Sequence, residues 1–133
     1  MRSLAVLAVV LAGCASPEVD LTAGGAVVHA YTNVAFAETP DARAQGLIGR
    51  APLAPDEAMM LDYPVVDQAC ITNADVDFPI SAIYIDSNGG IVAVESLAAH
   101  DARIPCHDGV LRVLETDASG AALARGATEV VVR

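Results

Sequence analysis

The sequence contains no lysine and no tryptophan, and aromatic residues make up only 4% of its 133 positions. Its seven cationic side chains are all arginine and face 17 aspartate and glutamate residues, which gives a formal net charge of −10. This excess of acid argues against binding to nucleic acids or to anionic lipid head groups, because their phosphates carry the same sign of charge. The scarcity of aromatic rings argues against a flat aromatic platform for carbohydrates.

The N-terminus also lacks an apolar run long enough to cross a bilayer. Leu4 to Leu11 is well short of the about 20 residues that a spanning helix needs. The run follows Arg2 and leads through small residues to Cys14, and these are the proportions of a secretory signal. The ending resembles the bacterial lipobox, in which the cysteine is acylated and becomes the new N-terminus. An ordinary signal peptide cleaved near Ala15 is the alternative.

We therefore predict a lipoprotein signal peptide over residues 1–13, with Cys14 as the lipidation site. The protein is expected to be exported and to contact a membrane through this lipid anchor. In a cell with two membranes we expect it at the periplasmic face of the outer membrane, because no acidic retention residue follows Cys14.

The remaining chain divides into a tether and one domain. Residues 14–25 include Pro17, Gly24 and Gly25 and show no sustained hydrophobic period, so a flexible tether is predicted there. Residues 26–133 are expected to form a single domain, long enough to bury a core without a metal or a disulfide.

Short alternating apolar segments dominate this domain and predict strands. We expect a mostly β (α+β) fold: a small antiparallel barrel or curled sheet of six to seven strands, with one short capped helix after the first strand. The predicted strands cover residues 27–36, 58–63, 65–72, 80–85, 91–94, 110–114 and 128–132, and a single helical turn is expected over 121–125.

Two local signals are particularly clear. Thr39 and Pro40 predict a capped helix start, and the helix is expected to run through Ile48 and to end at Gly49. The turn that contains Asn88-Gly89 predicts a hairpin, because these residues tolerate the positive φ angles of a tight reversal.

The order of motifs resembles domain of unknown function family 192. Residues 43–50 match its Arg-x-x-Gly-Leu-x-x-Arg signature. An apolar strand at 59–64, then Asn73, Pro79 and the segment 113–115 follow in the family's order. The resemblance covers residues 27–132. It implies a shared fold and an envelope setting, without an established reaction.

This chain departs from the family pattern at three places, one of which is the longer spacing between Asn73 and Pro79, with residues inserted around 75–78. Cys70, Ile71 and Thr72 stand where the family usually has Trp-Met-Lys, and Ser81 stands where it usually has aspartate. The family's polar cluster is therefore altered here.

The predicted helix supplies the first candidate site. Arg43 and Arg50 bracket it and could hold a carboxylate or phosphate through paired hydrogen bonds. Alternatively, each arginine pairs with a nearby carboxylate such as Glu57 or Glu115. The ligand-binding candidates are Arg43, Arg50, Asn73 and Ser81.

Cys70 and Cys106 are the cysteines that remain once Cys14 is acylated. In an oxidising compartment they are expected to pair as a disulfide. The rival interpretation takes His100, Cys106 and His107 as soft ligands for zinc or copper.

These patterns contain no convincing nucleophile–base pair or metal motif, and no cofactor is expected. The primary hypothesis is a lipid-anchored envelope domain that binds a small ligand or an envelope protein without catalysis. One alternative is a metal-handling protein or enzyme that uses His100, Cys106 and His107. Another is a structural accessory lipoprotein.

Overall fold

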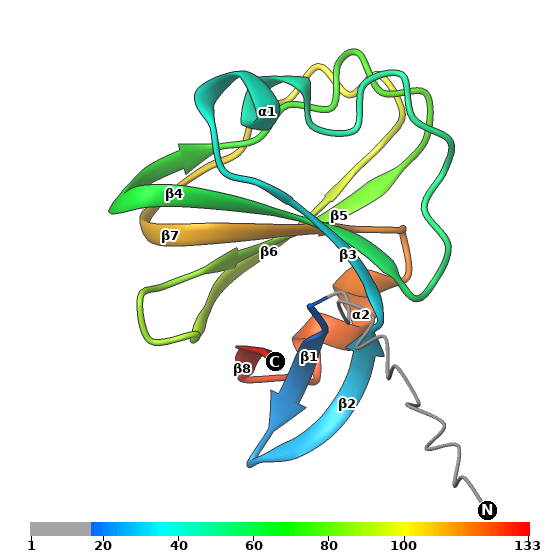
Figure 1. Ribbon diagram of the computed structural model, residues 1–133. Helices are drawn as coiled ribbons and strands as arrows, with labels where there is room; N and C mark the ends of the chain where they lie inside the picture. The colour runs from blue at the N-terminus through cyan, green and yellow to red at the C-terminus, as the bar shows by residue number, and fades with distance from the viewer. Residues whose placement is uncertain (1–16) are drawn as a thin grey trace, which may run out of the picture.

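The computed structural model describes residues 17–133, so the predicted signal peptide and Cys14 lie outside the described residues. Two sheets and two short helices make up this part of the chain (Figure 1). The larger sheet has the strand order β3-β4-β7-β5-β6, and the smaller sheet has the order β2-β1-β8. The elements are β1 (Val19–Ala23), β2 (Ala26–Tyr31), β3 (Asn33–Ala37), α1 (Pro40–Gln45), β4 (Glu57–Cys70), β5 (Ile80–Ile85), β6 (Ile91–Leu97), β7 (Cys106–Thr116), α2 (Gly120–Arg125) and β8 (Glu129–Val132).

The mostly β prediction is confirmed, but the described strands do not close into a barrel. The pairing is antiparallel except for β3, which runs parallel to β4. Eight strands replace the predicted six to seven, and α1 follows the third strand instead of the first. One cause is Thr32, where the expected strand 27–36 divides into β2 and β3, which belong to different sheets.

The domain begins earlier than the sequence indicated. Residues 14–25 were predicted to be a flexible tether, yet Val19–Ala23 form β1, the central strand of the smaller sheet. Gly24 and Gly25 have φ angles of 59° and 81° and reverse the chain between β1 and β2. A tight hairpin needs this backbone conformation, so the glycines are turn residues of the domain.

Two other boundaries differ for local reasons. The segments 58–63 and 65–72 form one strand, β4, whose register with β7 shifts between Asp62 and Asp67. Pro64 lies in this irregular stretch, where its missing N–H breaks no regular ladder. Helix α1 ends at Gly46, which has a φ of 46°, and so stops before the predicted Gly49.

The larger sheet has a hydrophobic cluster on each face, because neighbouring strand residues point to opposite sides. Met60 and Leu114 belong to the cluster that includes residues of β1, α2 and β8. Leu61 and Val113, one position away, belong to the cluster that includes Leu47 after α1 and the loop residues 71, 76 and 78. Figure 1 shows α1 on one side of the larger sheet and the smaller sheet with α2 on the other.

Several predicted elements are confirmed. The Thr39 side chain accepts a hydrogen bond of 3.1 Å from the Ala42 N–H, with Pro40 in the first turn of α1. Strand β5 has the predicted bounds, and it pairs with β6 as a hairpin. Among residues 17–133, no helix has the length and apolar character of a membrane span.

Candidate ligand pocket

A cavity of about 230 Å³ lies where α1, β4, β7 and the segment after β4 meet. Its apolar walls include Leu47, Leu61, Ile71 and Val76. Its polar lining side chains are Arg43, Gln45, Tyr63, Thr72, Asn73, Asp75 and Glu115. A cavity of about 150 Å³ is sufficient for benzene, so this one has room for a small organic molecule.

Glu115 is the buried charge of this cavity. It lies on β7 opposite Met59 of β4 and Ala82 of β5, in the middle of the larger sheet. Only 5% of the residue is exposed. Burial alone raises the pKa of its carboxyl to about 7, because a low-dielectric surrounding disfavours the charged form. Within residues 17–133, no hydrogen bond or ion pair reaches this carboxyl.

Arg43 lines the same cavity but is directed to backbone oxygens. Its Nη1 donates hydrogen bonds of 2.9 Å to the carbonyl oxygens of Glu38 and Asp62. Its guanidinium carbon lies 5.0 Å from the centre of the Tyr63 ring, a cation–π arrangement. The arginine thus fastens α1 to β4 and leaves Glu115 without a counter-charge.

The charges of Glu115 and Arg43 both act on the phenol of Tyr63. Burial raises the pKa of its phenol, Glu115 raises it further, and Arg43 lowers it. The phenol therefore stays neutral at physiological pH. It contributes a hydroxyl and a ring to the cavity without adding charge.

Asn73 closes the cavity beside the segment after β4. Its Nδ2 donates to the carbonyl oxygens of Phe78 and Ala98, at 3.0 and 2.8 Å, and so joins two loops. The Oδ1 atom is buried and has no partner within the described chain. Asn73 is fully buried, and its amide nitrogen is used structurally.

The other two predicted ligand-binding residues lie elsewhere. Arg50 is exposed and does not line the cavity. The Ser81 hydroxyl donates to the Ala118 carbonyl and accepts from the Ala121 N–H, at 3.2 and 2.9 Å. It thereby satisfies a free N–H in the first turn of α2. The structure brings Arg43 and Asn73 to one cavity and leaves Arg50 and Ser81 outside it.

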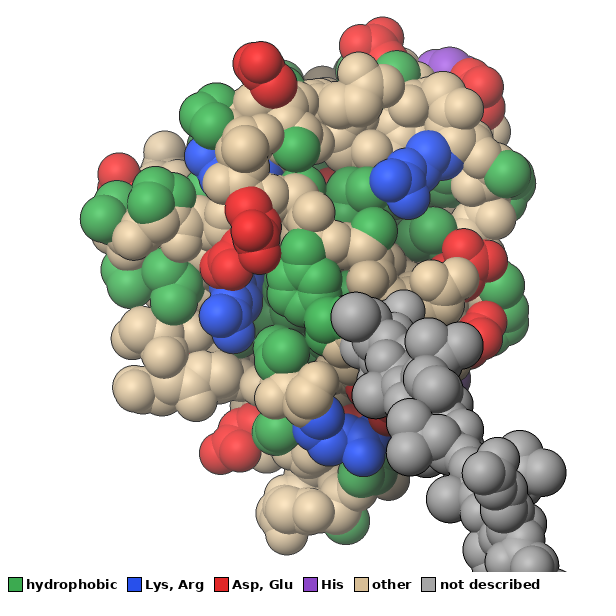
Figure 2. Space-filling model, in the orientation of Figure 1, with side chains coloured by type: hydrophobic (Ala, Val, Ile, Leu, Met, Phe, Trp, Pro, Cys, Tyr) green, Lys and Arg blue, Asp and Glu red, His purple; other side chains and the backbone are tan. Residues whose placement is uncertain are grey.

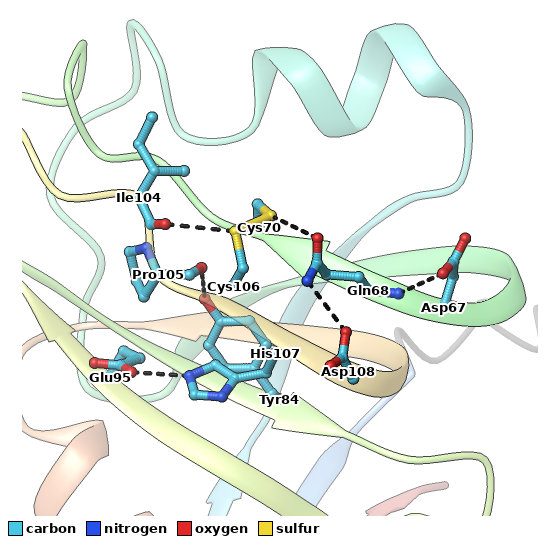
Figure 3. Close-up of a disulfide and its surroundings, with 10 residues drawn as sticks. All are labelled: Asp67, Gln68, Cys70, Tyr84, Glu95, Ile104, Pro105, Cys106, His107 and Asp108. Atoms are coloured by element: carbon cyan, nitrogen blue, oxygen red, sulfur yellow. Dashed lines mark hydrogen bonds and ion pairs between the residues drawn. A yellow bond between two sulfur atoms is a disulfide. The ribbon is translucent and has the colours of Figure 1, made fainter.

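The predicted disulfide between Cys70 and Cys106 is confirmed (Figure 3). The two residues are opposite each other in the β4–β7 register, with their Cα atoms 4.0 Å apart. Cys70 also lines the cavity. The bond therefore fixes the end of β4 from which the cavity wall at residues 71–76 continues.

The residues of the metal hypothesis are held in separate interactions. Cys106 is in the disulfide and has no thiolate to offer. His107 Nε2 lies 2.8 Å from Glu95 Oε1, and its ring meets the edge of Tyr84 (Figure 3). His100 instead lies 3.1 Å from Asp77. Across residues 17–133, no three His, Cys, Asp or Glu side chains are grouped as metal ligands.

Sequence reasoning missed Glu115 and Tyr63 as members of the site. The sequence placed Glu115 in the family's 113–115 segment and offered it as an ion-pair partner for an arginine, but not as a ligand-binding residue. The available signal is the alternation of β7, in which Val113 and Glu115 share the face opposite to Leu114. An acid at a core-facing position of a buried strand is the pattern that marks this cavity.

Comparisons with known proteins agree with this architecture. A crystal structure of a candidate transcription regulator from Sinorhizobium meliloti 1021 is 25% identical over 88% of this chain and 92% of that one, with a TM-score of 0.78. A crystal structure of a protein of unknown function from Novosphingobium aromaticivorans DSM 12444 is 21% identical. The match covers 87% of this chain and 83% of that one, with a TM-score of 0.75. No curated protein matches the chain at a significant level. The family model of DUF192, described as an uncharacterised ACR, matches residues 19–128, and the chain belongs to this family.

Proposed function

We propose that this protein is a binding module that holds a small ligand in the cavity between α1, β4 and β7, without catalysing a reaction. The observation that carries the proposal is the buried, unpartnered Glu115 at a cavity of about 230 Å³. Leaving a buried carboxyl unpartnered costs stability, and such groups concentrate at binding and catalytic sites. An apolar cavity with a few polar groups is also the usual form of a small-molecule site.

The surface does not favour nucleic acid as the partner, although one structural neighbour is named as a candidate regulator. On the face drawn in Figure 2, the basic side chains lie apart from one another, with hydrophobic, acidic and other side chains between them. A protein that tracks a phosphate backbone needs a continuous basic surface.

We further propose that the mature protein is lipid-anchored through Cys14 and exported. The support is the signal-like N-terminus together with the Cys70–Cys106 disulfide, a bond typical of oxidising compartments. Intact mass of the protein from native membranes, without reductant, tests both features together. A diacylated or triacylated chain that begins at Cys14 is expected. An unmodified full-length chain in the soluble cell interior contradicts this proposal.

The binding proposal is tested with ¹⁵N-labelled protein and a library of small organic fragments. Chemical shift changes are expected to cluster on the residues that line the cavity. Ala44→Phe adds a bulky ring at the exposed α1 side of the cavity and should abolish those shifts. Ala118→Phe, at an exposed position before α2, is the matched control and should leave them intact.

Two outcomes contradict the binding proposal. If no fragment shifts the cavity residues, the cavity is a packing feature. If instead the protein turns over an envelope substrate and Arg43→Ala abolishes that turnover, the module is an enzyme.

A further inference from the structure

We infer that the cavity takes a small organic amine, whose ammonium group pairs with the Glu115 carboxylate while its carbon body lies on the apolar wall. This inference rests on the proposed function and names the ligand class of the same site. Its first support is the lack of a partner for Glu115 among the described residues. Buried carboxylates in proteins are normally paired, so a cation from outside would complete this site.

The nearest cation of the protein does not perform that role. Arg43 lines the cavity, but its Nη1 is held by two backbone carbonyls and its guanidinium lies over Tyr63. Arg43 does not lower the pKa of Glu115, which burial alone raises. Among residues 17–133, no counter-charge therefore pairs with Glu115.

The remaining groups around Glu115 favour a cation as well. Tyr63 and Tyr84, on the two flanking strands, have raised phenol pKa values and stay neutral. Asp75 adds a second carboxylate to the cavity lining. The whole chain carries a net charge of −10, and its field raises the local concentration of cations.

The cavity walls indicate an organic cation with a carbon ring or a short chain. Leu47, Leu61, Ile71 and Val76 form an apolar surface, and the volume of about 230 Å³ exceeds the about 150 Å³ that accepts benzene. A divalent metal ion needs several oxygen or nitrogen ligands. The described residues contain no group of three such ligands, so the buried Glu115 carboxylate points to an ammonium group.

The test compares three probes of one shape and different charge: cyclohexylamine, cyclohexanol and cyclohexanecarboxylate. Calorimetric titration of the full chain at about pH 8, where Glu115 is ionised, should show the amine binding at least about 10-fold more tightly than the alcohol. Between about pH 8 and 5.5 the amine affinity should fall about 30-fold, because Glu115 must release its proton to bind.

Glu115→Gln should remove both the amine preference and its pH dependence while cyclohexanol binding is retained. Glu129→Gln, on β8, makes the same charge change outside the cavity lining and should alter neither. A second measurement does not depend on the variant. In the unsubstituted protein, the ¹³C resonance of the Glu115 carboxyl should titrate at lower pH when the amine is bound.

Tighter binding of cyclohexanecarboxylate overturns the inference and identifies an anion site at Arg43, while the proposed binding function stands. Equal binding of amine and alcohol also overturns it. If none of the three probes binds at millimolar concentration the inference fails, and the fragment screen then decides separately whether the cavity binds any ligand.

Discussion

Arg133 holds the buried carboxylate of Asp20 through two atoms. Its Nε lies 2.7 Å from Asp20 Oδ2, and its Nη2 donates to Oδ1 at 3.0 Å. Asp20 is 3% exposed on β1, whereas Arg133 directly follows β8. The pair therefore joins the first and last strands of the domain.

Arg133→Ala should lower the free energy of unfolding by about 2 kcal/mol, because it leaves a buried carboxylate without its partner. Urea unfolding monitored by circular dichroism measures the change. Arg125→Ala removes an arginine in α2 that forms no ion pair within residues 17–133, and it should cost less than about 0.5 kcal/mol. Equal effects of the two substitutions would contradict a specific role for the Asp20 pair.

Glu115 should make the folded protein less stable as the pH rises. Its folded-state pKa of about 7 lies above the ordinary value of 4.5, so the folded state retains the proton where the unfolded state loses it. The contribution of Glu115 to the free energy of unfolding is unchanged below about pH 4.5. It decreases as the pH rises to about 7 and is constant above that, and the total loss is about 3 kcal/mol. Glu115→Gln should consequently be more stable than the unsubstituted protein above pH 7 and equal to it in acid.

Unfolding curves between about pH 4 and 8 measure this difference, with Glu129→Gln as the control. The titration of Asp101 does not contribute to the change in stability over this pH range. Its pKa is held below the usual range by hydrogen bonds from Arg103, so its contribution is lost only at lower pH. If the free energies of unfolding of the unsubstituted protein and of Glu115→Gln differ by the same amount at every pH, then burial does not raise the pKa of Glu115.

The disulfide should stabilise the fold mainly by restricting the unfolded chain. Cys70 and Cys106 are 36 residues apart, and closing a loop of this length is worth about 4 kcal/mol on the chain-entropy model. The double substitution Cys70→Ser/Cys106→Ser should therefore unfold at clearly lower urea concentration. Reductant should destabilise the unsubstituted protein to a similar extent and leave the double variant unchanged, whereas insensitivity of both would contradict the bond.

Gly120→Ala should destabilise the protein by about 1–3 kcal/mol through overpacking. A Cβ at Gly120 would overlap Thr116 Oγ1 and lie 2.9 Å from Thr116 Cβ and 3.2 Å from Tyr31 Oη, and both Thr116 and Tyr31 are fully buried. Gly126 closes the other end of α2, and a Cβ there meets only a carbonyl oxygen at 3.5 Å. Gly126→Ala should be neutral or slightly stabilising. Thermal unfolding of the two variants decides whether the close approach at Gly120 is real.

Part of the candidate site could be predicted from the sequence. Arg43 and Asn73 were identified through the family motif, and they do line one cavity. Arg50 and Ser81 come from the same motif, yet Arg50 is exposed and Ser81 binds the first turn of α2. A motif records which residues recur together and does not specify whether they face a common space.

The sequence by itself determined the features that depend on neighbouring residues. The Thr39 cap, the β5–β6 hairpin and the bounds of β5 all follow from interactions within a few positions of the chain. Only the tertiary structure decided that β1 belongs to the domain, because its partners are β2 and the distant β8. It likewise decided the state of Glu115, whose burial depends on α1 and on strands far away in sequence. Solvation of a charge is set by everything packed around it, so the alternation of β7 can mark Glu115 as core-facing but does not give its burial or its pKa.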